Sequence, residues 1–363
     1  MLQPPQNLIF EIPGRRSGCP MQCKHCIHQN VQSSGQTELT PEEIINIIEQ
    51  GCDYGIKYLN IYPHFDDISI APPSTIEYLK LGQRLGYKIK TVTNGANPAG
   101  IERILPYLTR LAISVDSLDQ AEYGLLRDER FHSAVLETLK LLKAYRQQVP
   151  LYINALVIVN KKTIGTIEKR VAALYQLRMF DKIQIQEMLP IGGAAHLKDA
   201  ALTSATDLVP LVRLEKEYRH KIAFATPLWR IKNQKRGCQL GFKDLVIGPQ
   251  GQLAGCSLLF CVNHVVGNIR EYESVAQAWE TAFQIFREKA LRPVAADCRQ
   301  CAFYQYDLCW GGCLARMLIF GPEMEIKRSC GMQNGIDSWQ QFEKYDQMPE
   351  KPGSFLACDF NYD

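Results

Sequence analysis

Residues 18–26 read GCPMQCKHC and place Cys19, Cys23 and Cys26 in the spacing C-x3-C-x2-C. Three thiolates this close together can hold three irons of one cubane [4Fe–4S] cluster, which takes four cysteines when fully ligated. The next cysteine is Cys52, on a predicted helix. The spacing therefore predicts a cluster with one open iron, and an open metal position is where a substrate or cofactor binds. The alternative is a zinc site, but zinc sites usually pair two C-x2-C units, or one such unit with two histidines.

The composition indicates a cysteine-rich protein of the cytoplasm. The chain has 363 residues, 13 cysteines and a formal net charge of +3. Its first residues carry neither a basic start nor a long apolar run, so they do not resemble a signal peptide. No run of about 18 apolar residues predicts a membrane span. Many cysteines in a cytoplasmic chain favour metal binding or catalysis over disulfides. A net charge this small gives no reason to expect nucleic acid as a partner.

Strand and helix patterns alternate along the first part of the chain. Thr40–Glu43 and Ser74–Glu77 both read as capping boxes, and the second helix is expected to stop near Gly86. A further helix is predicted over 163–177. Strand–helix alternation predicts parallel pairing, and six units are too few for a closed eight-stranded barrel. We therefore expect an open, partial (β/α)6 barrel. The predicted strands are 8–12, 58–62, 87–92, 111–115, 151–159 and 183–188.

The cysteine loop follows the first predicted strand, which is the end where parallel α/β folds build active sites. This order, over roughly residues 6–200, resembles the radical S-adenosylmethionine (SAM) enzymes. The resemblance implies that the open iron chelates the amino and carboxylate groups of SAM. It also implies that an electron from the cluster cleaves SAM to methionine and a 5′-deoxyadenosyl radical.

Several short segments after successive strands resemble the positions where this family contacts SAM. Each is weak alone, because Asn-Gly and Gly-Gly are ordinary turn chemistry, but their order after successive strands strengthens the set. The predicted SAM-contacting residues are Asn94 in Thr-Asn-Gly, Ser114 and Asp116 in Ser-Val-Asp, Asn154 in the fifth strand, and Gly192 after the sixth.

One family element is missing after the second strand. The family commonly has Gly-Gly-Glu there to hold the SAM amino group, whereas this chain reads Tyr62-Pro-His-Phe-Asp-Asp67. A carboxylate suits an ammonium group, so Asp66 or Asp67 is predicted to replace it. The open alternative is that both aspartates belong to a loop that faces water. His64 is a further candidate.

A second set of cysteines lies in the C-terminal third. Residues 238–256 give C-x12-G-x4-C, residues 298–313 give C-x2-C-x7-C-x3-C, and Cys330 follows. This pattern resembles the SPASM domain, a C-terminal extension of radical SAM enzymes, although its x7 gap is two residues longer than usual. The resemblance implies two auxiliary [4Fe–4S] clusters, hence three clusters in all. Cys298, Cys301, Cys309 and Cys330 would hold one, and Cys238, Cys256 and Cys313 the other, whose fourth position is either filled by Cys261 or left as an open iron for a substrate. A zinc-ribbon pair is the alternative.

These observations divide the chain into a radical SAM partial barrel (1–205), a helical linker (206–236) and a SPASM domain (237–363), in which a helix is expected over 274–291.

The resemblance implies a ribosomally made precursor peptide as substrate, modified by crosslinking, epimerisation or backbone excision, and an electron donor such as flavodoxin or ferredoxin. Because the first strand is expected near Leu8, two routes are open for a precursor peptide: a separate leader-recognition protein presents it, or it docks directly between the two domains. Cys358 is a candidate hydrogen-atom donor. The alternatives are a maturase of the sulfatase kind, which Ser257 disfavours because an Asp is usual there, a small-molecule radical dehydrogenase, and a zinc-binding module.

Overall fold

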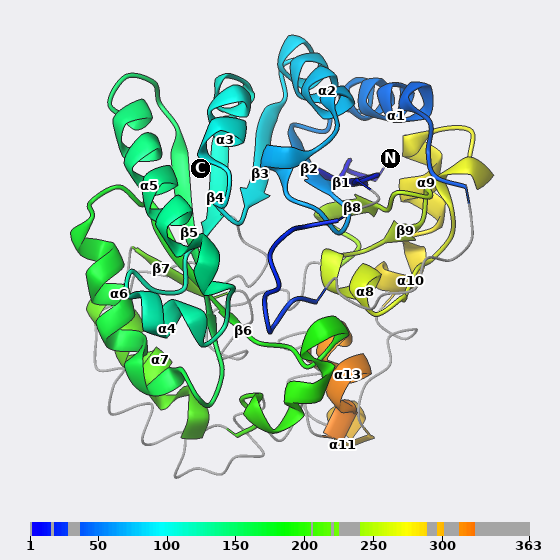
Figure 1. Cartoon of the computed structure of the whole chain (residues 1–363). Helices are drawn as coiled ribbons and strands as arrows, with labels where there is room; N and C mark the ends of the chain where they lie inside the picture. Colours follow the sequence, from blue (N-terminus) through cyan, green and yellow to red (C-terminus); the bar gives the residue numbers. More distant parts are fainter. Residues whose placement is uncertain are drawn as a thin grey trace.

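The protein is built on one open nine-stranded sheet (Figure 1). The computed structural model describes residues 2–15, 18–27, 37–204, 206–218, 221–224, 240–288, 296–300 and 312–323. Strand order is β7-β6-β5-β4-β3-β2-β1-β8-β9, so β7 and β9 form opposite edges of the described sheet. All neighbours are parallel except β8 and β9. The strands are β1 Asn7–Ile12, β2 Tyr58–Pro63, β3 Lys88–Thr93, β4 Arg110–Ser114, β5 Tyr152–Val159, β6 Lys182–Glu187, β7 Ile222–Phe224, β8 Asp244–Ile247 and β9 Leu253–Ala254.

The predicted parallel core of the sheet is confirmed, but two parallel strands were not expected. All six predicted strands form β1 to β6 in chain order. β7 lies inside 206–236, so a purely helical linker is wrong for the described residues there: α7 is followed by a strand that pairs with β6. β8 lies inside 237–363 and yet pairs in parallel with β1. Because both strands are only three or four residues long, neither carries enough alternation to be recognised in the sequence.

Helices cover the outer face of the sheet, and α8, α9 and α10 lie beside its β8–β9 edge (Figure 1). The helix predicted over 274–291 is divided into α9 and α10, and the one predicted over 163–177 is the shorter α6. The helices are α1 Pro41–Asp53, α2 Pro73–Arg84, α3 Pro98–Ile104, α4 Gln120–Gly124, α5 His132–Arg146, α6 Ile167–Gln176, α7 Val209–Tyr218, α8 Ser257–Cys261, α9 Val275–Thr281, α10 Gln284–Arg287, α11 Ala296–Gln300 and α13 Leu314–Phe320.

The two predicted capping boxes have different outcomes. At α1, Thr40 accepts a hydrogen bond from the Glu43 N–H, and the Glu43 carboxylate accepts one from the Thr40 N–H, as predicted. At α2 the prediction of Ser74 as the cap is wrong, because Pro72 is the N-cap and has no side-chain acceptor. Pro73 suits the first helical position, so α2 starts before Ser74. Gly86 follows the helix end in the left-handed region, with φ +81.

The sheet places polar side chains on the face away from the helices. In β1, Leu8, Phe10 and Ile12 join the hydrophobic core, and the alternation of a strand turns Glu11 to the opposite face. Glu11 is nevertheless buried, as are the polar residues Asn60, Lys90 and Asn154 of neighbouring strands. The inner side of the sheet is therefore both enclosed and polar, which suits a site for a polar ligand at its carboxyl edge.

Candidate active site

The loop that carries the first three cysteines lies at the carboxyl edge of the parallel strands. It leaves β1 and is held by backbone hydrogen bonds from loops that follow other strands. The Cys19 N–H donates to the Phe65 carbonyl after β2 (2.9 Å), and the Gly193 N–H donates to the Cys26 carbonyl after β6 (2.8 Å). Positions distant in the chain thus fix both ends of the cysteine motif, and Gly193 is adjacent to the predicted site residue Gly192.

The three thiols fit the cluster predicted for them. All three cysteines are free, and burial raises the pKa of Cys19 to about 11, with further increases from the nearby thiolates of Cys23 and Cys26. Thiolates this close repel one another until a cation binds them, and a bound metal deprotonates its thiol ligands. In the described part of the chain no group of His, Cys, Asp or Glu converges on a site for a single metal ion. A cluster does not require such convergence, because its cysteines bind different irons.

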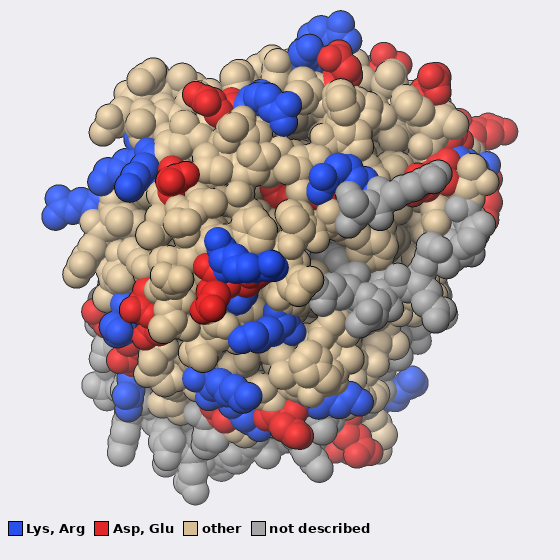
Figure 2. Space-filling model, viewed as in Figure 1, with Lys and Arg blue, Asp and Glu red and all other residues tan. Residues whose placement is uncertain are grey.

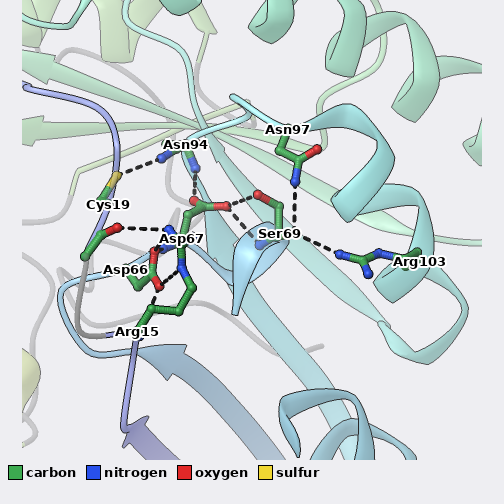
Figure 3. A network of polar contacts seen from close by, with 9 residues as sticks. Arg15, Cys19, Asp66, Asp67, Ser69, Asn94, Asn97 and Arg103 are labelled. Atoms are coloured by element: carbon green, nitrogen blue, oxygen red, sulfur yellow. Dashed lines mark hydrogen bonds and ion pairs between the residues drawn. The ribbon is translucent and has the colours of Figure 1, made fainter. Parts of the chain in front are cut away.

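Asn94 connects the predicted SAM-contacting segments to the cluster loop (Figure 3). Its side-chain amide donates to Cys19 Sγ (3.3 Å), and its backbone N–H donates to Asp67 Oδ2 (2.6 Å). The structure therefore brings together a residue after β3, a residue after β2 and the first cysteine. A donor on a ligating sulfur is one of the ways in which a protein tunes a cluster.

Asp67 is a buried structural acceptor. Its Oδ1 accepts hydrogen bonds from the Ser69 N–H (3.0 Å), the Ser69 hydroxyl (2.6 Å) and the Thr93 hydroxyl (2.9 Å). Burial raises the pKa of Asp67, and these hydrogen bonds oppose that increase. The carboxylate joins the turn after β2 to the end of β3.

Asp66 is engaged by Arg15, which follows β1. The Arg15 Nε donates to Asp66 Oδ2 (2.7 Å) and its Nη2 donates to Oδ1 (3.1 Å). The same guanidinium donates to the Gly18 carbonyl at 2.9 Å, one residue before Cys19. Phe65, between these contacts, has φ +58, which is unusual for a bulky residue. The turn that replaces Gly-Gly-Glu thus clamps the cluster loop. The binding of the SAM ammonium by Asp66 or Asp67 stays a prediction.

The remaining predicted SAM-contacting residues occupy different environments. Ser114 ends β4 and is half-buried. Asp116 is fully buried and forms an ion pair with Arg127 (2.5 Å). Asn154 is also buried, and among the described residues no donor reaches its Oδ1. Gly192 has φ +56, a conformation that favours glycine.

Four of the C-terminal cysteines lie in the described part of the chain, namely Cys256, Cys261, Cys298 and Cys313. Cys256 immediately precedes α8 and Cys313 immediately precedes α13, and these two helices pack against each other. Cys261 ends α8. Burial raises its pKa far above normal, and the charges of Glu11, Cys256 and Cys26 raise it further, so it lies within electrostatic range of both cysteine sets. Cys298 lies in α11. The predicted residues that lie outside the described part of the chain are Cys238, Cys301, Cys309, Cys330 and Cys358.

Two polar pairs near the site were not predicted, although His64 itself was a candidate from the sequence. His64 Nδ1 lies 2.9 Å from Glu11 Oε2, and the His64 ring makes an edge contact with Phe260 of α8. At the end of β6, Glu187 accepts a hydrogen bond from Arg316 of α13 (2.8 Å), and both side chains are buried. The Arg316 pair joins β6 directly to α13, and the His64 pair reaches α8 through the ring contact with Phe260; both helices start beside a cysteine. Pairings over such sequence distances leave no local pattern.

The comparisons with known proteins agree with this geometry. Residues 16–173 match the family described as Radical SAM superfamily, and residues 238–302 match SPASM, an iron-sulfur cluster-binding domain. The chain contains a radical SAM domain followed by a SPASM domain. It is therefore a radical SAM enzyme that uses SAM and iron–sulfur clusters. The first match contains Cys19, Cys23 and Cys26.

Named proteins and solved structures resemble the chain over most of its length. The chain is 20% identical over 341 residues to PqqA peptide cyclase of Streptomyces rochei, covering 90% of each. Streptococcus suis SuiB bound to S-adenosylmethionine has a TM-score of 0.67 at 17% identity, with 91% of this chain and 77% of that chain covered. Native anSMEcpe with bound AdoMet and Cp18Cys peptide has a TM-score of 0.66 at 16% identity, with 94% and 96% covered. At identities of 17% and 16%, the likeness to these solved structures shows a shared fold and nothing beyond it.

Proposed function

We propose that this radical SAM enzyme modifies a ribosomally made peptide. The observation that carries the proposal is that α8, with Cys256 before it and Cys261 at its end, packs against the turn that holds the cluster loop: the Phe260 ring lies 5.5 Å from the His64 ring, and the Phe65 carbonyl next to His64 accepts a hydrogen bond from the Cys19 N–H. A substrate held between them would lie near both cysteine sets. The name of the curated relative, PqqA peptide cyclase, and the peptide bound to the structural neighbour anSMEcpe support a peptide as the substrate.

Different sets of cysteines would hold the different clusters. Cys19, Cys23 and Cys26 would hold the SAM-binding cluster, and SAM bound to it supplies a 5′-deoxyadenosyl radical that removes a hydrogen atom from substrate. Cys256, Cys313 and Cys261 would contribute to the nearer auxiliary cluster, together with Cys238. The remaining SPASM cysteines would hold the third [4Fe–4S] cluster. Three clusters per chain is part of the proposal.

The turn after β2 prepares the site for SAM. Asp66 and Arg15 fix the backbone before Cys19, and Asp67 orients Asn94. An ammonium group held without an anionic or carbonyl partner would be costly. We therefore propose that this turn, through Asp66, Asp67 or its carbonyl groups, receives the amino group of SAM. Ser114, Asn154 and Gly192 would contact the rest of the cofactor.

Substrate delivery would not rely on a strong surface field. Lys and Arg side chains are interspersed with Asp and Glu on the face shown in Figure 2, and the net charge is only +3. Long-range steering of a charged partner needs one dominant sign. We propose that a separate leader-recognition protein presents the peptide and that flavodoxin or ferredoxin supplies electrons in the cytoplasm. Within the described residues, no helix is both long and apolar enough to cross a bilayer.

The experiment that tests the function uses anaerobically reconstituted protein and a synthetic copy of the peptide encoded by any short open reading frame found beside its gene. Incubation with SAM and dithionite should produce 5′-deoxyadenosine and a peptide with altered mass. The triple variant Cys19→Ala/Cys23→Ala/Cys26→Ala should abolish both products and keep about two-thirds of the iron, because the auxiliary sites are separately ligated. SAM cleavage by the triple variant would overturn the assignment of these cysteines.

The alternatives give different results in the same assay. A maturase of the sulfatase kind would modify a folded or nascent protein, and a small-molecule dehydrogenase would ignore every peptide. A zinc-binding module would contain zinc without the absorbance of iron–sulfur clusters. A peptide product with changed mass distinguishes the proposed function from all three.

A further inference from the structure

A buried cation faces the central cysteine of the cluster loop. Arg127 follows α4 and is 7% exposed. Its Nη1 lies 3.9 Å from Cys23 Sγ, within reach of a weak hydrogen bond to sulfur. Beside it, the Leu126 carbonyl accepts a hydrogen bond from the Lys24 N–H (2.9 Å). This backbone hydrogen bond therefore holds the segment after β4, and Arg127 with it, against the cluster loop.

Asp116 holds this guanidinium in place. Its Oδ2 accepts from Arg127 Nε (2.5 Å), and its Oδ1 accepts from the Ile158 N–H of β5 (2.5 Å). The Asp116 backbone carbonyl accepts from Arg170 of α6 (3.0 Å). Both carboxylate oxygens are thus used by protein donors in a residue that is 0% exposed. This environment suits a support for Arg127 better than the contact with SAM that the sequence predicts for Asp116.

The charges of this pair do not cancel at the cysteine. The guanidinium of Arg127 reaches Cys23 Sγ, whereas the Asp116 carboxylate is turned to Arg127 Nε and to the Ile158 N–H. The pair is enclosed, so solvent screens it little. Of the two charges in this pair, the cation is therefore the one that contacts the sulfur of Cys23.

We propose that Arg127 is a positioning residue that raises the reduction potential of the cluster bound through Cys23, and that Asp116 fixes Arg127 for this role. Reduction adds one negative charge to the cluster, and a nearby buried cation stabilises the more negative state. Hydrogen bonds and charges at ligating sulfurs are established controls of cluster potential. The inference rests on the SAM-binding cluster of the radical SAM domain and does not depend on the identity of the peptide.

The test compares the ion pair with a neutral pair of similar shape. In Asp116→Asn/Arg127→Gln, two amides replace two charges, so no buried charge is left unpaired. A redox titration followed by electron paramagnetic resonance, on the reconstituted full chain, reports the potential without substrate. The relevant signal is the one that changes when SAM is added. At the wild-type midpoint, the neutral pair should show an at least tenfold lower ratio of reduced to oxidised cluster, equal to a shift of 59 mV for one electron.

Two control variants distinguish an effect of the charge on the potential from an effect of a disturbed fold. Arg127→Lys keeps the cation and should change that ratio less than twofold. Arg130→Gln removes a nearby arginine whose side chain is 67% exposed, and it should leave the potential unchanged. An unchanged potential in the neutral pair would overturn the inference. Loss of the SAM-responsive cluster from the neutral pair would overturn it too, since the pair would then be needed for assembly. So would a shift in Arg127→Lys as large as in the neutral pair.

Discussion

The cluster loop is held by an Arg–Asp pair on each flank, and the two pairs differ in burial. Arg15 and Asp66 meet at 2.7 Å with side chains 37% and 0% exposed, whereas Arg127 and Asp116 meet at 2.5 Å with side chains 7% and 0% exposed. Water can screen and replace the first cation but not the second. Buried pairs add little net stability over an apolar pair, yet they are costly to break. We therefore expect the Arg15 flank to tolerate change and the Arg127 flank to resist it.

The largest effect should come from breaking the buried pair on one side only. Arg127→Ala leaves the carboxylate of Asp116 buried without its cation, which should lower the free energy of unfolding by about 3–5 kcal/mol. Thermal unfolding of the anaerobic protein measures this loss. The matched neutral pair, Asp116→Asn/Arg127→Gln, should recover most of it. If Arg127→Ala unfolds like the wild type, the guanidinium is not buried against Asp116.

Breaking the pair of Arg15 and Asp66 should lower stability less than breaking the buried pair, and it should also affect SAM binding. Arg15→Met removes one charge-assisted partner of Asp66, which should lower stability by about 1–2 kcal/mol because water reaches the site. If Asp66 also receives the SAM ammonium, Asp66→Asn should weaken SAM binding by about 1.5–3 kcal/mol.

Calorimetric titration of SAM into both variants distinguishes the two roles. Equal losses of SAM affinity in Arg15→Met and Asp66→Asn would mean that the carboxylate acts only by holding the loop. Asp67→Asn tests the neighbour, and full SAM affinity in both aspartate variants would place the amino group elsewhere in the turn.

Asn94 allows a neutral donor to be compared with the cationic one. Asn94→Ala removes the hydrogen bond to Cys19 Sγ, which is worth about 1 kcal/mol. The cluster potential should become more negative, but less so than in the neutral Asp116–Arg127 pair, because a dipole acts more weakly than a charge. The same redox titration provides the measurement. A larger shift in Asn94→Ala than in the neutral Asp116–Arg127 pair would show that the neutral donor at Cys19 affects the potential more than the cation at Cys23.

The sequence predicted the parts of this molecule that are local. The spacing of Cys19, Cys23 and Cys26 and the position of their loop after a strand were enough to predict the cluster chemistry and the open parallel sheet. The partners of the site were not predictable, because Arg127 and Arg316 follow no motif and meet acidic residues that are distant in the chain. β7 and β8 were missed because strands of three and four residues are stabilised by their neighbours rather than by their own pattern.

The smallest effect should come from an ion pair between the two domains. Arg270, beside the SPASM helices, contacts both carboxylate oxygens of Glu43 in α1, at 2.6 and 2.7 Å. This contact lowers the pKa of Glu43 to about 2. Both side chains are about one-third exposed, so Arg270→Met should lower stability by only about 0.5–1 kcal/mol.

High salt separates this surface pair from the buried one. In 1 M salt the Debye length falls to about 3 Å, so the difference between Arg270→Met and the wild type should shrink, whereas the loss in Arg127→Ala should persist. Lys80→Met is the control, since its pair with Glu77 lies within one exposed helix and joins no domains. Thermal unfolding in low and high salt gives all three comparisons. A salt-independent loss in Arg270→Met would show that this arginine acts through its contacts with the Thr37 and Glu38 carbonyls rather than through charge.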